Sequence, residues 1–203
     1  GGTTFTKVLG TGAGATNDWM TDMDIAGNGD LYVGVNGSGI YKSAASLLAN
    51  QGTVGNWTRL TTNFGAGYNR VELAASQSNS NYVYAVCEAN NANTDIFRTT
   101  NAGLTWSATS GQPVAGAYNY NSDISNGQAW YDLSIGVDPS DHQVVYVGGI
   151  NQHRSTNGGT SWSLLTDAYG PGQYIHPDQH AVAFNSTNPQ KLVFGNDGGI
   201  WYS

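Results

Sequence analysis

The sequence predicts an all-β protein: a β-propeller segment of about four four-stranded blades, itself part of a larger propeller. Three observations on its 203 residues lead to this prediction: only 10% of the residues are charged, 28 are glycine, and one unit of strands and a turn recurs four times. Roughly 25% charged residues is usual in soluble domains, and the Lys and Glu that build surface helices are scarce. Glycine-rich turns between runs of Val, Tyr and Trp indicate short strands.

The repeat is clearest at a glycine-rich turn. Residues 98–106 (RTTNAGLTW) and 154–162 (RSTNGGTSW) have the same layout. The residues that open the four turns lie 56, 56 and 48 residues apart, at Ser43, Thr99, Ser155 and Ser203. Strand-rich repeats of about this length are typical of propeller blades.

Each unit is predicted to contain four strands. An inner and a second strand form a pair, as in 71–75 and 82–86; a short third strand runs to the turn, and the fourth begins at a Trp. We expect the blades at 18–61, 68–110, 130–166 and 176–203, the last one completed by a strand in 1–9 or by further chain.

The first unit and the single cysteine need separate explanations. Residues 43–56 form an insertion, of which residues 44–50 could fold as a helical turn, before the blade resumes at Trp57. Cys87 lies within a strand-like run, where a free cysteine most often serves as a small buried apolar residue.

The residues of the recurring turn are predicted to maintain the fold. An Asn side chain can bind backbone amides of the turn, Gly can adopt a positive φ, and Trp can cover the apolar seam between blades. The residues with these structural roles are Thr99, Asn101, Gly103 and Trp106, and Ser155, Asn157, Gly159 and Trp162.

The turn resembles the Asp-box of BNR-repeat propellers, Ser-x-Asp-x-Gly-x-Thr-Trp, with Asn101 and Asn157 at the Asp position. That family includes sialidases, xyloglucanase-type glycoside hydrolases and the sortilin luminal domain. Segments 130–139, 176–181 and 195–200 look most like large glycosyl-hydrolase-like or sortilin-like surface proteins of Bacteroidota. The resemblance implies a secreted or cell-surface bacterial protein, but an Asp-box stabilises a blade and performs no chemistry.

Charge and hydropathy limit the classes of partner. The net charge is −7 and no basic run occurs, which disfavours binding to nucleic acid. No apolar stretch approaches the roughly 18 to 20 residues of a membrane span, so membrane insertion is not expected. A polysaccharide or an extracellular protein is the expected partner, together with further blades or domains of the same chain.

The resemblance to xyloglucanase-type enzymes implies two Asp residues acting as acid and base. Alignment of the blades places Asn36 and Asn196 at those positions, and neither is a carboxylate. Inverting hydrolysis requires two carboxyl groups, and Asp197, one residue away, is the single candidate. We therefore expect a recognition or scaffold module, with a fragment of a glycoside hydrolase as the alternative.

The best local cluster is His176, Asp178 and His180. In an extended chain these residues point to one face, where they could bind Zn²⁺ or another divalent ion, with Asp197 as a fourth ligand. A polar ligand site and structural hydrogen bonding are the alternatives. No other cofactor is indicated.

Aromatic and amide residues indicate where a carbohydrate could bind, because sugar rings stack on aromatic faces. Segments 118–121, 128–131 and 169–174 have this composition, and Trp130 and Tyr131 are the candidate ligand-binding residues among them. Loops on a rigid scaffold are where binding usually resides. Packing between blades is the alternative role.

Overall fold

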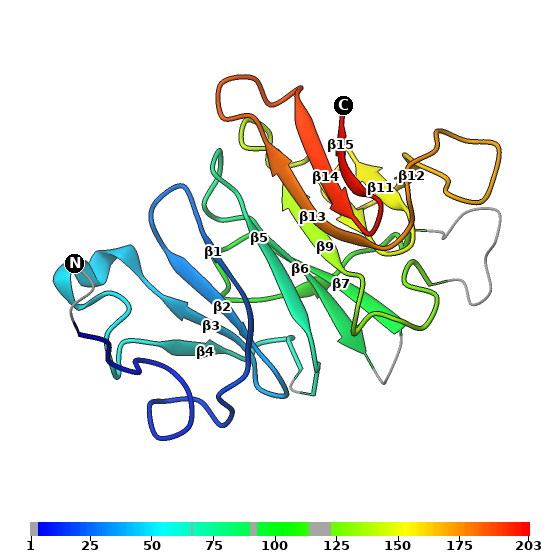
Figure 1. Ribbon diagram of the computed structural model, residues 1–203. Coiled ribbons are helices and arrows are strands. Elements are labelled where there is room, and N and C mark those ends of the chain that lie inside the picture. Colours follow the sequence, from blue (N-terminus) through cyan, green and yellow to red (C-terminus); the bar gives the residue numbers. More distant parts are fainter. Residues whose placement is uncertain (1–3, 66, 90–92, 114–122) are drawn as a thin grey trace.

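The computed structural model describes residues 4–65, 67–89, 93–113 and 123–203. They form four antiparallel sheets that follow one another in chain order (Figure 1). The first sheet contains β1 (Met20–Ile25), β2 (Leu31–Val35), β3 (Gly39–Ser43) and β4 (Thr58–Leu60). The second contains β5 (Val71–Ala75), β6 (Val83–Ala89), β7 (Asn93–Thr99) and β8 (Ser107–Ala108).

The third and fourth sheets repeat the arrangement. The third contains β9 (Ser134–Val137), β10 (Val145–Gly148), β11 (Gln152–Ser155) and β12 (Ser163–Leu164). The fourth contains β13 (Gln179–Phe184), β14 (Leu192–Asn196) and β15 (Gly199–Tyr202). Within each sheet the spatial order of the strands equals their order in the chain, as in a propeller blade.

The recurring turn lies where the repeat predicts it. The third strands β3, β7 and β11 end at Ser43, Thr99 and Ser155, and β15 ends one residue before Ser203. The fourth strands begin directly after Trp57, Trp106 and Trp162. The insertion in the first blade includes a short 3₁₀ helix, η1 (Ala45–Asn50), at the predicted helical turn.

The expected strand in residues 1–9 does not form within the described part of that segment. Residues 4–9 pair with no strand, and Leu9 packs against Val33, Val35 and Tyr41 of the first blade. The fourth blade accordingly has three strands. The apolar side chain of Leu9 is buried on the nearest sheet face, and this burial requires no ladder of hydrogen bonds.

The core lies in the seams between blades. Tyr32 and Ile40 of the first blade pack with Val71 and Leu73 of the second, and Trp106 closes this cluster as a buried side chain. Cys87 belongs to the same cluster and is buried, as predicted. Because a blade buries both faces against its neighbours, few positions remain for charged side chains.

The two glycine-rich turns have matching hydrogen bonds. The Asn101 side-chain oxygen accepts a bond from the Thr105 amide at 2.9 Å, and Thr99 Oγ1 accepts one from the Gly103 amide at 3.0 Å. Gly103 has a φ of +89°, a conformation that glycine adopts without steric cost. Polar side chains therefore satisfy backbone groups that the turn leaves unpaired.

The second turn reproduces the first. Asn157 accepts from the Ser161 amide at 2.9 Å, and Ser155 Oγ accepts from the Gly159 amide at 2.8 Å. Trp162 packs at the seam between the second and third blades, where its indole nitrogen donates to the carbonyl oxygen of Gly111.

The inner strands β1, β5, β9 and β13 lie next to one another in that order. The free edge of β5 would expose unpaired amides, but Asp22 of β1 accepts from the Leu73 amide at 2.8 Å and Asp24 from the Ala75 amide at 2.7 Å. Burial raises the pKa of both carboxyls. Side chains of one blade thus cap the backbone of the next.

No helix among the described residues is long and apolar enough to cross a membrane.

Candidate functional site

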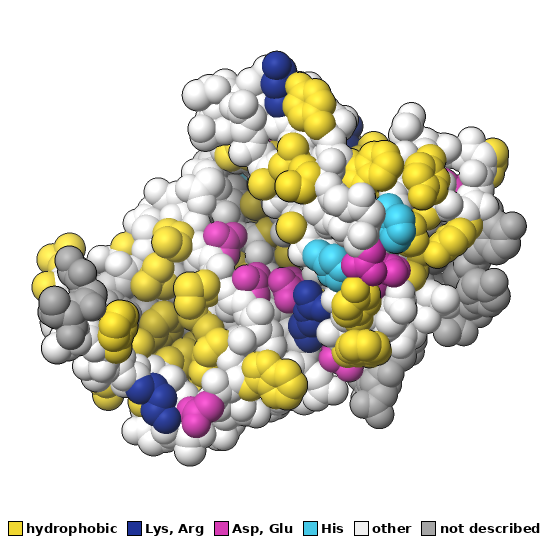
Figure 2. Space-filling view, viewed as in Figure 1, with side chains coloured by type: hydrophobic (Ala, Val, Ile, Leu, Met, Phe, Trp, Pro, Cys, Tyr) yellow, Lys and Arg dark blue, Asp and Glu magenta, His cyan; other side chains and the backbone are white. Residues whose placement is uncertain are grey.

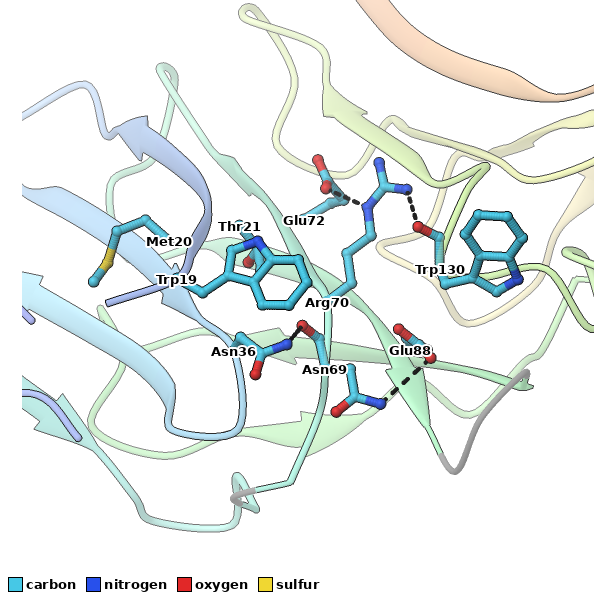
Figure 3. Close-up of a pocket in the computed structure, with 9 residues that line it drawn as sticks. All are labelled: Trp19, Met20, Thr21, Asn36, Asn69, Arg70, Glu72, Glu88 and Trp130. Carbon is cyan, nitrogen blue, oxygen red and sulfur yellow. Dashed lines mark hydrogen bonds and ion pairs between the residues drawn. The ribbon is translucent and has the colours of Figure 1, made fainter. Parts of the chain in front are cut away.

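The candidate site is a cavity of about 390 Å³ at one end of the inner strands. Figure 3 shows Trp19 and Trp130 on either side of Arg70. The indoles are unusually open to solvent for such large apolar groups: Trp19 is 68% exposed and Trp130 is 65% exposed. The other lining residues are Met20, Thr21, Asn36, Asn69, Arg70, Glu72 and Glu88.

Arg70 holds the cavity wall together. Its Nε donates to Glu72 at 2.7 Å, and its terminal nitrogens donate to the carbonyl oxygens of Tyr131 at 2.6 Å, Leu133 at 3.1 Å and Trp130 at 3.3 Å. All three guanidinium nitrogens are therefore engaged with the protein. Arg70 fixes the loop that carries Trp130 and Tyr131, and it has little capacity left for an anionic ligand.

Amides and carboxylates form the polar side of the cavity. Glu88 is only 6% exposed and accepts a hydrogen bond from the Asn69 side chain at 3.4 Å. Asn36 donates to the carbonyl oxygen of Asn69 at 2.5 Å. Burial raises the pKa of Glu72, although its ion pair with Arg70 opposes that shift. This lining can accept hydrogen bonds from ligand hydroxyl or amino groups.

A second group of side chains borders Trp130. The Tyr131 hydroxyl donates to the two carboxylate oxygens of Asp197 at 2.8 and 2.9 Å, and His180 Nε2 lies 2.7 Å from the same carboxylate. The rings of Tyr131 and His180 meet edge to face at 4.8 Å. The bond with His180 lowers the pKa of Asp197, and the bond to Asp197 raises the pKa of Tyr131.

Beneath this group lies a pair of carboxyl groups. The Gln128 amide donates to Asp178 at 2.9 Å and to Asp132 at 3.3 Å. Asp132 is buried, and one of its oxygens has no hydrogen-bond partner. Burial, reinforced by the charge of Asp178, raises the pKa of Asp132 to about 8. Asp132 is therefore mostly protonated at neutral pH.

His176, Asp178 and His180 do not lie along one extended strand. Asp178 has a φ of +64°, which breaks the extended conformation on which the predicted metal site depended, and β13 begins one residue later at Gln179. His176 lies against Gly198, with its Nδ1 3.1 Å from the carbonyl oxygen of Pro177, whereas His180 turns to Asp197. Among the described residues no group of three His, Cys, Asp or Glu side chains could hold a metal ion.

The structure brings most of the predicted ligand-binding residues together. Trp130, Tyr131, His180 and Asp197 form one continuous surface group, with Asp178 beneath it. Figure 2 shows histidine, acidic and apolar side chains gathered on this face. Segment 118–121 lies outside the described residues, and Tyr174 lines a separate cavity of about 370 Å³ with Trp201.

The positions aligned with catalytic residues carry no acid–base pair. Asn36 lines the cavity, and Asn196 uses its side-chain oxygen to accept from the Trp201 indole at 2.9 Å. Asp197 is exposed and engaged by Tyr131 and His180. The carboxylates that do line the cavity are Glu72 and Glu88.

Sequence reasoning missed Trp19, Arg70 and Glu88. The repeat contains a signal that could have found the first two: Trp19 directly precedes β1, Arg70 precedes β5, and the segment 130–133 precedes β9. Residues at the same position of each blade lie at the same end of a propeller. The entries to the inner strands therefore share one surface.

Neither a protein-family model nor a curated protein matches this sequence. Solved structures do match. A GH74 enzyme of Niastella koreensis is 19% identical with a TM-score of 0.61, over 91% of this chain and 28% of that one. The GH74 xyloglucanase of Xanthomonas campestris is 18% identical with a TM-score of 0.62, over 94% and 29%.

A third similar structure is an auxiliary nutrient binding protein from Bacteroides thetaiotaomicron, 12% identical with a TM-score of 0.55, over 90% of this chain and 46% of that one. At these identities the likeness shows the fold alone, a β-propeller. The chain spans less than a third of the length of the two GH74 enzymes.

Proposed function

We propose that this chain is a propeller module that recognises a polysaccharide at the cell surface or outside a bacterial cell. The observation that carries the proposal is the pair of exposed indoles, Trp19 and Trp130, facing one cavity lined by amides and carboxylates. Indole faces cover the apolar face of a sugar ring, and amide and carboxylate oxygens accept bonds from its hydroxyls.

The rigidity of the wall supports this proposal. Arg70 pins the loop of Trp130 to the second blade through three backbone carbonyls, and Trp19 directly precedes β1. Aromatic groups held in place before binding lose little conformational entropy when a ligand arrives. The binding surface would continue beside Trp130 over the predicted ligand-binding residues Tyr131, His176, Asp178, His180 and Asp197.

A glycoside hydrolase fragment of xyloglucanase-like type is the second candidate. Glu72 and Glu88 line the same cavity, and general acid–base hydrolysis needs two carboxyl groups. The amides at Asn36 and Asn196 weigh against the specific catalytic positions of that enzyme type. We propose the recognition module as the principal function and expect no release of product.

A glycan array followed by a reducing-end release assay tests both candidates. Retention of a polysaccharide without product supports recognition, and hydrolysis supports the enzyme. Trp19→Ala and Trp130→Ala should each weaken retention at least about fivefold, since stacking on one indole is worth roughly 1 kcal/mol or more. Phe5→Ala, at an exposed aromatic residue that does not line this cavity, is the matched control. Retention unaffected by both Trp variants would contradict the proposed site.

A further inference from the structure

The charged side chains that line the Trp19–Trp130 cavity differ in how far the protein itself already occupies their hydrogen-bonding groups. Arg70 is the one basic residue among the described lining residues, and its guanidinium already binds Glu72 and three carbonyl oxygens. A carboxylate or sulfate on a ligand would therefore have to displace existing bonds. Anionic polysaccharides are disfavoured here.

The carboxylate of Glu88, in contrast to the guanidinium of Arg70, has few partners within the protein. It is more than nine-tenths buried, lines the cavity, and has no ion-pair partner among the described residues. Within the described part of the chain, its carboxylate accepts one hydrogen bond, from the neutral Asn69 amide at 3.4 Å, which is longer than a strong charge-assisted bond. Buried carboxylates are usually paired, so this group lacks the cation that such sites normally contain.

The indoles complete the environment of a cation site. An ammonium group over an indole face is attracted by the ring quadrupole, and Trp is the best side chain for this contact. Trp19 and Trp130 are exposed to solvent, and they line the same cavity as Glu88. Aromatic faces and an uncompensated carboxylate together select positive charge.

We propose that the Trp19–Trp130 cavity binds a sugar residue with a free amino group, that is, a polysaccharide of amino sugars, with Glu88 as the counter-ion of the ammonium. This inference rests on the proposed polysaccharide recognition and names the ligand class of the same cavity. The ammonium would donate to Glu88 while the apolar face of its ring covers an indole.

The test compares two soluble oligosaccharides of equal length, β-1,4-linked glucosamine and β-1,4-linked N-acetylglucosamine, by calorimetry at a pH where the amine is protonated. We expect the charged oligomer to bind on the order of tenfold more tightly, since cation–π contact and pairing with Glu88 add to stacking. Added salt should reduce this preference, because it screens charge pairs.

Variants assign the effect to Glu88. Glu88→Gln should remove most of the preference for the charged oligomer over the N-acetylated oligomer, whatever its effect on the affinity for each one. Asp18→Asn removes one negative charge at an exposed position that does not line this cavity and should keep the preference. The salt dependence of the unmodified protein tests the proposal even if Glu88→Gln does not fold.

The outcomes separate the two proposals. Equal binding of both oligomers, lost in Trp19→Ala, overturns the amino-sugar inference and leaves polysaccharide recognition standing. Binding of neither oligomer, while other glycans are retained at the indoles, also overturns the inference alone. Retention of a lysine-rich peptide at the cavity with no glycan bound overturns both in favour of a protein partner.

Discussion

The guanidinium of Arg70, at the entry to the second inner strand, donates a 2.6 Å hydrogen bond to the carbonyl oxygen of Tyr131, 61 residues further along the chain. This bond joins the second blade to the loop that enters the third. With the bonds to Trp130 and Leu133, it places an aromatic surface over a cavity that the second blade lines.

Replacing Arg70 by Lys should loosen that loop. Lysine keeps the charge, but it cannot reproduce the fork of donors that reaches three carbonyl oxygens and Glu72. We expect a loss of about 2–3 kcal/mol in the free energy of unfolding and faster amide exchange in residues 128–133. Arg59→Lys is the control, since exposed Arg59 donates to one carbonyl, that of Ser38. Equal effects of the two substitutions would contradict the role given to Arg70.

Asp132 makes stability depend on pH. Its pKa is raised from 3.8 to about 8, so the stability it contributes is complete below pH 3.8 and is lost as pH rises to about 8. Asp132→Asn should flatten this fall, which amounts to at most about 1.4 kcal/mol per pH unit. Denaturant unfolding at a series of pH values measures it.

The control for that titration is Asp18→Asn. The pKa of Asp18 is lowered, so its contribution changes below the pH range in question, and the variant should keep the fall between about pH 4 and 8. A wild-type curve parallel to that of Asp132→Asn would show that Asp132 is ionised in the folded protein.

The Tyr131–Asp197 bond should be visible in a tyrosine titration. The carboxylate raises the pKa of Tyr131, because it accepts a bond from the neutral phenol and repels the phenolate. In Asp197→Asn, one tyrosine should therefore ionise at lower pH than in the wild type. Phenolate absorbance measures the change, and Tyr131→Phe identifies the residue. An unchanged titration curve would mean that the bond does not persist in solution.

The recurring turn can be tested at Asn101. Asn101→Ala removes an acceptor for the Thr105 amide and a donor to the Thr105 hydroxyl, and should cost about 1–2 kcal/mol in unfolding free energy. Asn101→Asp should cost much less, because Thr105 can donate its own hydroxyl to the carboxylate. Calorimetric melting separates the two variants, and equal destabilisation would contradict this account.

The parts of the structure that depend on local pattern could be predicted. The third strands end at the predicted turn residues, and the helical turn near residue 45 is present, because both depend on neighbouring residues. The shared face of His176, Asp178 and His180 could not be judged from spacing, since one positive φ at Asp178 redirects the chain.

The cavity needed information that spacing does not contain. Arg70 acts on carbonyl oxygens 60 to 63 residues away, and any side chain at positions 130, 131 or 133 would present the same carbonyls. Glu88 continues the buried strand β6 and looks like any strand residue until its missing counter-ion is seen. Contacts between backbone and a distant side chain leave no pattern in the sequence of their acceptors.

In every sheet each strand pairs with its neighbour in the chain, and this order has a kinetic consequence. Contacts between sequence neighbours have low contact order, so a blade can close its hairpins before the next blade has emerged during synthesis. The carboxylates of Asp22 and Asp24 then meet the amides of β5 only when the second blade docks onto the first. The protein can therefore fold one blade at a time, and each blade that has formed offers the surface onto which the next blade docks.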